Sequence, residues 1–367
     1  MALLPIEAFV LSKEAPARPP PPRGQIRWRK TLFGDAISAA VTAVIIVTAL
    51  FVLPKLVQWA VVSGVWTGGP SACHDGGACW AFLREKAPQI LFGLYPPNDR
   101  WRPILVILLF LGLALWTMPP RHWSVATLWA WAVGVAAALV LMGGGVFGLK
   151  AVPTASWGGL PITLLLTVLS LSAGFPLAVL LALGRQSRLP AIRVLCIGFV
   201  ELVRALPLLT MLFIASLLSP LMLPNGLSID NFLRALVALT IYAAAYLAEV
   251  LRGGLQAIPR GQYEAACALA LNKWKTARLI VLPQAIAKVI PPLTNTIVVT
   301  VKNTSLVLVV GLFDLLSAGR AALADPVWPA PYTETFLFIA LIYFAICFSI
   351  SRYSLFLERR MASEGRQ

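Results

Sequence analysis

Long stretches without charge constrain this chain more than any other feature of its sequence. Five segments of at least 18 residues contain no Asp, Glu, Lys or Arg: 36–54, 103–120, 122–149, 151–184 and 205–229. Three further apolar segments contain a charge or are shorter: 232–252, 289–313 and 335–351. A helix needs about 20 mostly apolar residues to cross the hydrocarbon core of a bilayer. We therefore predict an all-α integral membrane protein with about eight transmembrane helices.

The composition excludes both a soluble protein and a nucleic-acid-binding protein. Hydrophobic residues make up 59% of the chain and charged residues only 12%, whereas soluble domains have roughly 45–50% and 25%. The formal net charge is +15, but a nucleic-acid-binding surface gathers its basic residues on one exposed face. Here they lie between apolar segments. Membrane lipid is the expected environment, and no nucleic acid is expected as a partner.

The positions of the basic residues predict the orientation, because cytoplasmic loops carry an excess of Lys and Arg. With both termini in the cytoplasm, 20 of the 30 lysines and arginines fall on the cytoplasmic side and six fall outside. The proline-rich segment 1–30 is too long and irregular for a secretory leader, so we predict a disordered cytoplasmic tail. The first span is therefore expected to remain as an anchor.

The predicted spans fall into two sections that meet near residue 155. The N-terminal section contains three helices and a long periplasmic loop, and the C-terminal section contains five helices and a long cytoplasmic loop. The boundaries are 31–155 with its loop at about 57–101, 156–358 with its loop at 252–288, and a cytoplasmic tail at 359–367.

Two cysteines lie close together in the predicted periplasmic loop. Cys73 and Cys79 are expected to form a disulfide, because this face of the membrane is oxidising. A metal site that includes His74 is the weaker alternative, since four ligands at a recognised spacing are missing. We therefore predict no metal.

Sequence motifs of catalysis are missing. No P-loop, nucleophile elbow or zinc-protease motif occurs, and the chain has only two histidines. Few side chains are thus available for acid–base chemistry. We predict that the chain is not an enzyme, has no catalytic residues and binds no cofactor.

The most informative segment follows the sixth predicted span. Pro259 begins a turn, and strong helix formers occupy 262–271. Asn272 tolerates the left-handed conformation that ends a helix, and a second short helix is expected from Lys273 until Pro283 ends it. The predicted product is a helix–turn–helix elbow beside the membrane, with small residues that let another surface approach. A plain connector on the lipid headgroups is the alternative.

A motif in this elbow resembles the EAA loop of permease subunits of ABC importers: Glu264-Ala265-Ala266 and, fourteen residues later, Ile280-x-Leu282-Pro283. That family usually has glycine where this chain has Ala270. The segments that resemble its polar-amino-acid branch are 159–164, 199–209, 248–254 and 302–306. Segments 77–82 and 95–102 resemble the longer permeases of general L-amino-acid and glutamate/glutamine/aspartate/asparagine importers, most of all their M-type (or C-type) subunit.

The resemblance implies a type I ABC-importer permease fold in the C-terminal five helices, in a subunit of the bacterial inner membrane. It implies ATP-driven alternating access that moves polar or general L-amino acids into the cytoplasm, with ATP and Mg used by a partner. The implied partners are a related second permease in a heterodimer, two cytoplasmic ATPase subunits and a periplasmic amino-acid-binding protein. The residues implied to couple to the ATPase are Gly261, Glu264, Ala265, Ala266, Ala270, Ile280, Leu282 and Pro283. A stand-alone secondary transporter and a polytopic membrane enzyme are the alternatives.

Polar residues inside the spans are functional candidates, because charges in a membrane are costly. Lys302 lies about 21 Å along a helix from Lys288, at 1.5 Å per residue, and so near the middle of the bilayer. Its face could line a substrate path, or its charge could form an internal ion pair. The path candidates are Asn295, Lys302, Asn303 and Ser305. Near the cytoplasmic ends, gating or structural pairing is expected of Glu201, Arg204 and Glu249.

Overall fold

The computed structural model describes residues 32–74, 76–218, 221, 224 and 229–364. The predicted tail 1–30 and the last residues of the predicted tail 359–367 lie outside the described residues. The chain divides into two compact units, Met1–Gly64 and Val65–Gln367. In the first unit, α2 (Ala36–Val57) continues as the π-helix η1 (Gln58–Val62). Its apolar side chains are mostly exposed, as expected for a helix that faces lipid.

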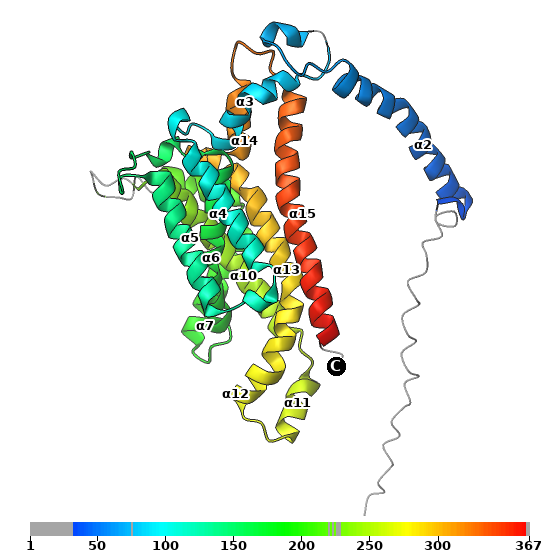
Figure 1. Ribbon diagram of the computed structural model, residues 1–367. Helices are drawn as coiled ribbons and strands as arrows, with labels where there is room; N and C mark the ends of the chain where they lie inside the picture. The colour runs from blue at the N-terminus through cyan, green and yellow to red at the C-terminus, as the bar shows by residue number, and fades with distance from the viewer. Residues whose placement is uncertain (1–31, 75, 219–220, 222–223, 225–228, 365–367) are drawn as a thin grey trace, which may run out of the picture. The chain divides into compact units, whose positions relative to one another are not determined.

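The second unit is a helical bundle built around α10 (Figure 1). Its long helices are α4 (Trp101–Thr117), α5 (Val125–Gly143), α6 (Gly159–Gly184), α10 (Asn231–Gln256), α13 (Leu282–Asn303) and α15 (Tyr332–Glu364). Helix α10 packs most extensively against α6. Small side chains make this possible: a Cβ added to Gly174 of α6 would lie 3.3 Å from Ala243 of α10.

The structure describes part of the predicted span 205–229, namely 205–218, 221, 224 and 229. Its first half contains the short helix α8 (Leu208–Phe213) and its π-helical continuation η6 (Ile214–Leu218). They follow α7 (Pro190–Ala205) after a bend of 101°. Pro207 causes the break, because a proline disfavours the helical conformation in the residue before it; Leu206 is extended, with φ −90° and ψ 134°. Among the described residues seven helices could cross a membrane, or up to eight if the bent pair is one span.

One end of the bundle is formed by two short helices, α3 (Trp80–Phe92) and α14 (Leu315–Leu323). Helix α3 lies inside the segment predicted as a loop, and packs on α14 and α6. The two-residue strand β1 (Phe313–Asp314) pairs with the start of α6. Short 3₁₀ helices connect the rest: η2 (Pro70–His74), η3 (Pro97–Asp99), η4 (Pro120–His122), η5 (Thr154–Ser156) and η8 (Thr304–Val310). We call the end formed by α3 and α14 the cap end of the bundle.

The opposite end carries a pair of short helices, α11 (Arg260–Ala268) and α12 (Lys273–Thr276). They project beyond the bundle below α10 and α13 in Figure 1. The predicted elbow therefore lies at the end of the bundle away from α3 and α14. We call this the elbow end.

Candidate functional site

The turn of the elbow is a Schellman motif with an alanine at its left-handed position. Leu271 N–H donates to Ala266 O at 3.0 Å, and Ala270 N–H donates to Cys267 O at 2.9 Å, which is the paired hydrogen bonding of that motif. Ala270 has φ +53°. The break predicted at Asn272 is therefore wrong. Asn272 instead caps the next helix, since its Oδ1 accepts from Lys275 N–H at 2.8 Å.

The second elbow helix does not stop at Pro283, as the sequence had predicted. Helix α12 continues through the π-helix η7 (Ala277–Val281) directly into α13. Proline is tolerated in the first turn of a helix, where its missing N–H needs no partner, and Pro283 occupies that position in α13. The elbow is thus joined to a helix of the bundle without an intervening loop.

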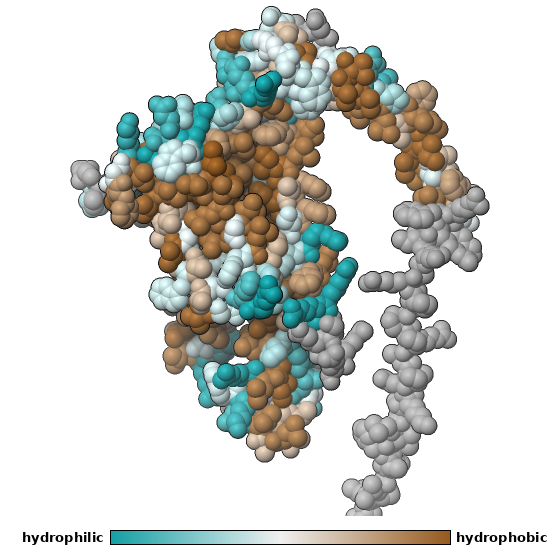
Figure 2. Space-filling model, viewed as in Figure 1, coloured by the Kyte–Doolittle hydropathy of each residue, from teal (hydrophilic) through white to brown (hydrophobic). Residues whose placement is uncertain are grey.

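The surface of the elbow carries apolar side chains among hydrophilic ones, as Figure 2 shows at the lower end of the molecule. Leu269, Trp274 and Leu279 are exposed large hydrophobic residues. Of the predicted coupling residues, all but two are exposed: Gly261, Glu264, Ala265, Ala270, Leu282 and Pro283. Ile280 is half-buried and Ala266 is fully buried. Ala266 therefore packs inside the elbow, and the expectation that it offers a contact surface is wrong.

Five charged side chains meet where α6, α7 and α10 come together. Arg185 Nη1 donates to Glu249 Oε2 at 2.8 Å, and its Nη2 lies 3.3 Å from Glu201 Oε1. Arg204 Nη1 lies 3.5 Å from Glu249 Oε2 and 3.7 Å from Glu201 Oε1. Arg252 Nε donates to Glu249 Oε2 at 3.1 Å. The structure thus brings together all three residues predicted to pair or gate.

Sequence reasoning missed Arg185 and Arg252 as members of this cluster. Arg185 follows α6 directly, and its part in the cluster depends on how α6 packs against α10. Arg252 lies three residues after Glu249, a spacing at which oppositely charged side chains on a helix can meet, so the sequence did hold a signal for it. Three guanidiniums around two carboxylates leave the cluster with excess positive charge.

A polar stripe runs along α10 from this charge cluster. Tyr242, Tyr246 and Glu249 are half-buried and four and three residues apart, so they share one face of the helix. The rings of Tyr242 and Tyr246 lie 4.4 Å apart, and the Arg204 guanidinium lies 5.8 Å from the Tyr246 ring centre. Asn303 of α13 interacts with the Tyr242 hydroxyl. No motif or spacing in the sequence singled out the two tyrosines.

The predicted path residues lie along α13 and just beyond its end. Asn295 and Lys302 are exposed, and Asn303 and Ser305 are half-buried. In the part of the chain that the structure describes, Lys302 forms no ion pair with a carboxylate. Helix α13 ends at Asn303 and η8 begins at Thr304, so Ser305 does not continue the α-helical face of Lys302.

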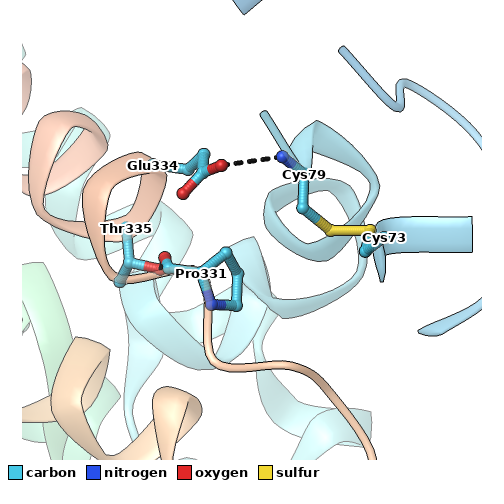
Figure 3. Close-up of a disulfide and its surroundings, with 5 residues drawn as sticks. All are labelled: Cys73, Cys79, Pro331, Glu334 and Thr335. Carbon is cyan, nitrogen blue, oxygen red and sulfur yellow. Dashed lines mark hydrogen bonds between the residues drawn. A yellow bond between two sulfur atoms is a disulfide. The ribbon is translucent and has the colours of Figure 1, made fainter. Parts of the chain in front are cut away.

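A disulfide, a hydrogen bond to a buried carboxylate and an ion pair hold the cap end together. A disulfide joins Cys73 to Cys79, and the Cys79 N–H donates to the buried carboxylate of Glu334 at 2.8 Å (Figure 3). Lys86 of α3 donates from its Nζ to Asp325 Oδ2 at 2.5 Å. This hydrogen bond lowers the pKa of the Asp325 carboxyl. The Glu334 contact thus holds the start of α3 against α15, and the Lys86–Asp325 pair holds α3 against the connection between α14 and α15.

These features define an α-helical, multi-span membrane protein with a docking elbow at one end of its bundle. Residues 174–363 match the family described as "binding-protein-dependent transport system inner membrane component". The chain belongs to this family of ABC-importer permeases. This confirms the predicted family, the permease fold of the C-terminal section and the prediction that the chain itself is not an enzyme.

Two relatives cover almost the whole chain. The inner membrane amino-acid ABC transporter permease protein YhdY of Escherichia coli is 44% identical over 92% of this chain and 93% of its own length. The glutamate/glutamine/aspartate/asparagine transport system permease protein BztC of Rhodobacter capsulatus is 35% identical over 98% of this chain and 99% of its own. The N-terminal helices and the cap are therefore part of what the chain shares with these relatives.

A solved structure supports the fold of the C-terminal section. An amino acid ABC transporter crystallised with histidines is 32% identical, covers 55% of this chain and 92% of its own, and has a TM-score of 0.51. A permease of this family works with an ATP-hydrolysing partner and a substrate-binding protein. The chain is accordingly a transport subunit of the inner membrane.

Proposed function

We propose that this chain carries polar or general L-amino acids inward as one half of the permease of an ABC importer. The observation that carries the proposal is the combination of an elbow continuous with α13 and a polar stripe on α10 that leads toward the elbow end. The names of the two full-length relatives support amino acids as the substrate class. A periplasmic amino-acid-binding protein is proposed to deliver the substrate to the end of the permease opposite the elbow.

The proposed orientation places the elbow end and both termini in the cytoplasm and the cap end in the periplasm. The excess of basic residues in the predicted cytoplasmic loops supports it. A second, related permease completes the path, and two ATPase subunits dock on the two elbows. In this chain Ala265 and the exposed Glu264 are proposed to contact the ATPase most closely. A small side chain leaves room for the partner surface, and a solvated carboxylate can reach the partner without moving out of a buried site.

The substrate path is proposed to follow the stripe of α10 and the end of α13. Lys302 supplies an ammonium that can pair with an α-carboxylate, and Asn303 and Ser305 add neutral hydrogen-bonding groups beside it. The faces of Tyr242 and Tyr246 can attract the ammonium of an amino acid. Farther along, the charge cluster around Glu249 is proposed to gate the path or to hold α6, α7 and α10 together.

Uptake by the reconstituted importer tests the proposal. Proteoliposomes with the two permeases, the ATPase and the binding protein should accumulate glutamate and glutamine only when ATP is inside. Uptake that is unaffected by loss of ATPase activity would instead indicate a stand-alone secondary transporter.

The variant Lys302→Met tests the path separately. The complex should assemble in normal yield, whereas uptake of glutamate and glutamine should change unequally, because only one of them has a charged side chain. Lys302→Arg keeps the charge and is the matched control. Unchanged uptake of both amino acids by a fully assembled Lys302→Met complex would remove Lys302 from the path without affecting the assignment of the chain as a permease.

A further inference from the structure

The loop between α5 and α6 carries a large apolar side chain at a position that disfavours one. Leu149 N–H donates to Val146 O at 3.0 Å and closes a four-residue turn. Its two central residues, Phe147 and Gly148, have φ of 52° and 73°, which is the pattern of a type I′ turn. Asn, Asp and Gly dominate the first central position of such turns. The backbone conformation of the turn therefore does not explain why phenylalanine occupies position 147.

The base of this turn is held firmly. Gly145 N–H donates to Leu149 O at 2.9 Å. The guanidinium of Arg102, a side chain only 2% exposed, donates to Lys150 O at 2.7 Å. A Cβ added to Gly144 would lie 2.1 Å from that same carbonyl oxygen, so the two arms of the loop are in direct backbone contact. The loop presents its tip in one fixed position.

The tip is exposed although it is apolar. Phe147 is 92% exposed and the preceding Val146 is 47% exposed. The loop holds an aromatic ring outward and does so in an unfavourable backbone conformation. Contacts within the loop do not compensate for this conformation, so we look for a contact outside it. Burying that ring in an apolar environment would provide such a contact, since burial of apolar surface is favourable.

The geometry of α5 identifies that environment as lipid. Its 19 residues span about 28 Å at 1.5 Å per residue, close to the roughly 30 Å of the hydrocarbon core. The loop therefore begins at the boundary between acyl chains and headgroups. Exposed apolar side chains at intervals of four and seven residues mark one lipid-facing stripe that runs toward the loop: Val125, Trp129, Val133 and Val140.

A tryptophan at the same end supports this placement. Trp101 is exposed at the first residue of α4, next to the Arg102 that holds the loop. Tryptophan is enriched at the membrane–water interface. We propose that the turn 145–149 is an interfacial membrane anchor, in which Phe147 inserts into the headgroup–acyl boundary at the cap end and fixes the depth of α4 and α5.

Spin labelling of the full chain tests the anchor. A nitroxide is attached at Val146→Cys in the assembled permease pair, in nanodiscs of phosphatidylethanolamine and phosphatidylglycerol. Val133→Cys on the lipid stripe and Arg84→Cys at an exposed position of α3 provide the lipid and water references. The remaining free cysteines are first replaced by alanine: Cys196, Cys267 and Cys347. The label at 146 should be accessible to oxygen and at least threefold less accessible than the label at 84 to a water-soluble nickel chelate.

A second variant shows whether Phe147 is responsible. Phe147→Asn suits a type I′ turn better than phenylalanine, so the loop should keep its fold while losing its apolar group. Nickel accessibility at 146 should then rise at least twofold. The anchor is refuted by nickel accessibility at 146 equal to that at 84, by protection that does not change in Phe147→Asn, or by protection that requires added binding protein. The last result would identify a protein contact instead.

Discussion

A glycine substitution usually destabilises a helix, but we predict that glycine in place of the left-handed Ala270 stabilises the elbow. Ala270 has φ +53° at the position of the Schellman motif that glycine normally occupies. A side chain in the left-handed region costs roughly 1–2 kcal/mol. Glycine removes this cost but adds about 0.4–1 kcal/mol through the greater freedom of the unfolded chain. Ala270→Gly should therefore stabilise the elbow by about 0.5–1 kcal/mol.

Hydrogen exchange of the permease pair without its ATPase measures this directly. Opening of the turn exposes the Leu271 and Ala270 amides, which donate across it. A gain of 0.5–1 kcal/mol should slow their exchange by roughly 2- to 5-fold, since 1.4 kcal/mol corresponds to tenfold. Ala268→Gly is the matched control: residue 268 is the last in α11 and right-handed, so glycine there should speed exchange. Faster exchange in Ala270→Gly, or equal effects of the two glycines, would contradict the argument.

Three further predictions concern the charge cluster, the cap and the elbow surface. Glu249→Gln should lower stability by about 2 kcal/mol, as expected for hydrogen bonds to a charged group, and lower the melting temperature in detergent more than Glu201→Gln; equal shifts would contradict the central place of Glu249. Because Lys86 lowers the pKa of Asp325 in the folded protein, their contact should persist at neutral pH and be lost as acidification passes through that lowered pKa, below about pH 4. Amide exchange of α3 should therefore accelerate in acid in the native chain but be independent of this titration in Asp325→Asn. Ala265→Trp should abolish ATPase binding in a pull-down while membrane insertion and heterodimer yield stay normal; retained binding would exclude Ala265 from the contact.

Local features of the sequence were sufficient for the spans and the presence of the elbow. Hydropathy and helix length depend on neighbouring residues, so the apolar segments around α2, α4, α5, α6 and α10 were recognisable without knowledge of packing. The elbow was recognisable because Pro259 and the helix formers after it act over a few residues. The resemblance then indicated the family, which the relatives confirm.

Some local signals pointed to the wrong residue because a tertiary contact or a neighbouring turn overrode them. The sequence placed the elbow break at Asn272, whereas the Schellman hydrogen bonds place it at Ala270. It took Pro283 as a stop, but the π-helix before it lets proline occupy the first turn of α13. The sequence did not show that the chain turns by 101° between α7 and α8, at the start of the predicted span 205–229.

The composition of the charge cluster and of the polar stripe was decided by tertiary structure. Arg185 and Glu249 are 64 residues apart and meet at 2.8 Å only because Gly174 and the alanines of α10 let α6 and α10 approach closely. The same packing leaves Tyr242 and Tyr246 half-buried on one face of α10 and buries Ala266 within the elbow. Which face of a membrane helix is covered depends on its neighbours, because lipid and protein interior are similarly apolar and hydropathy does not distinguish them.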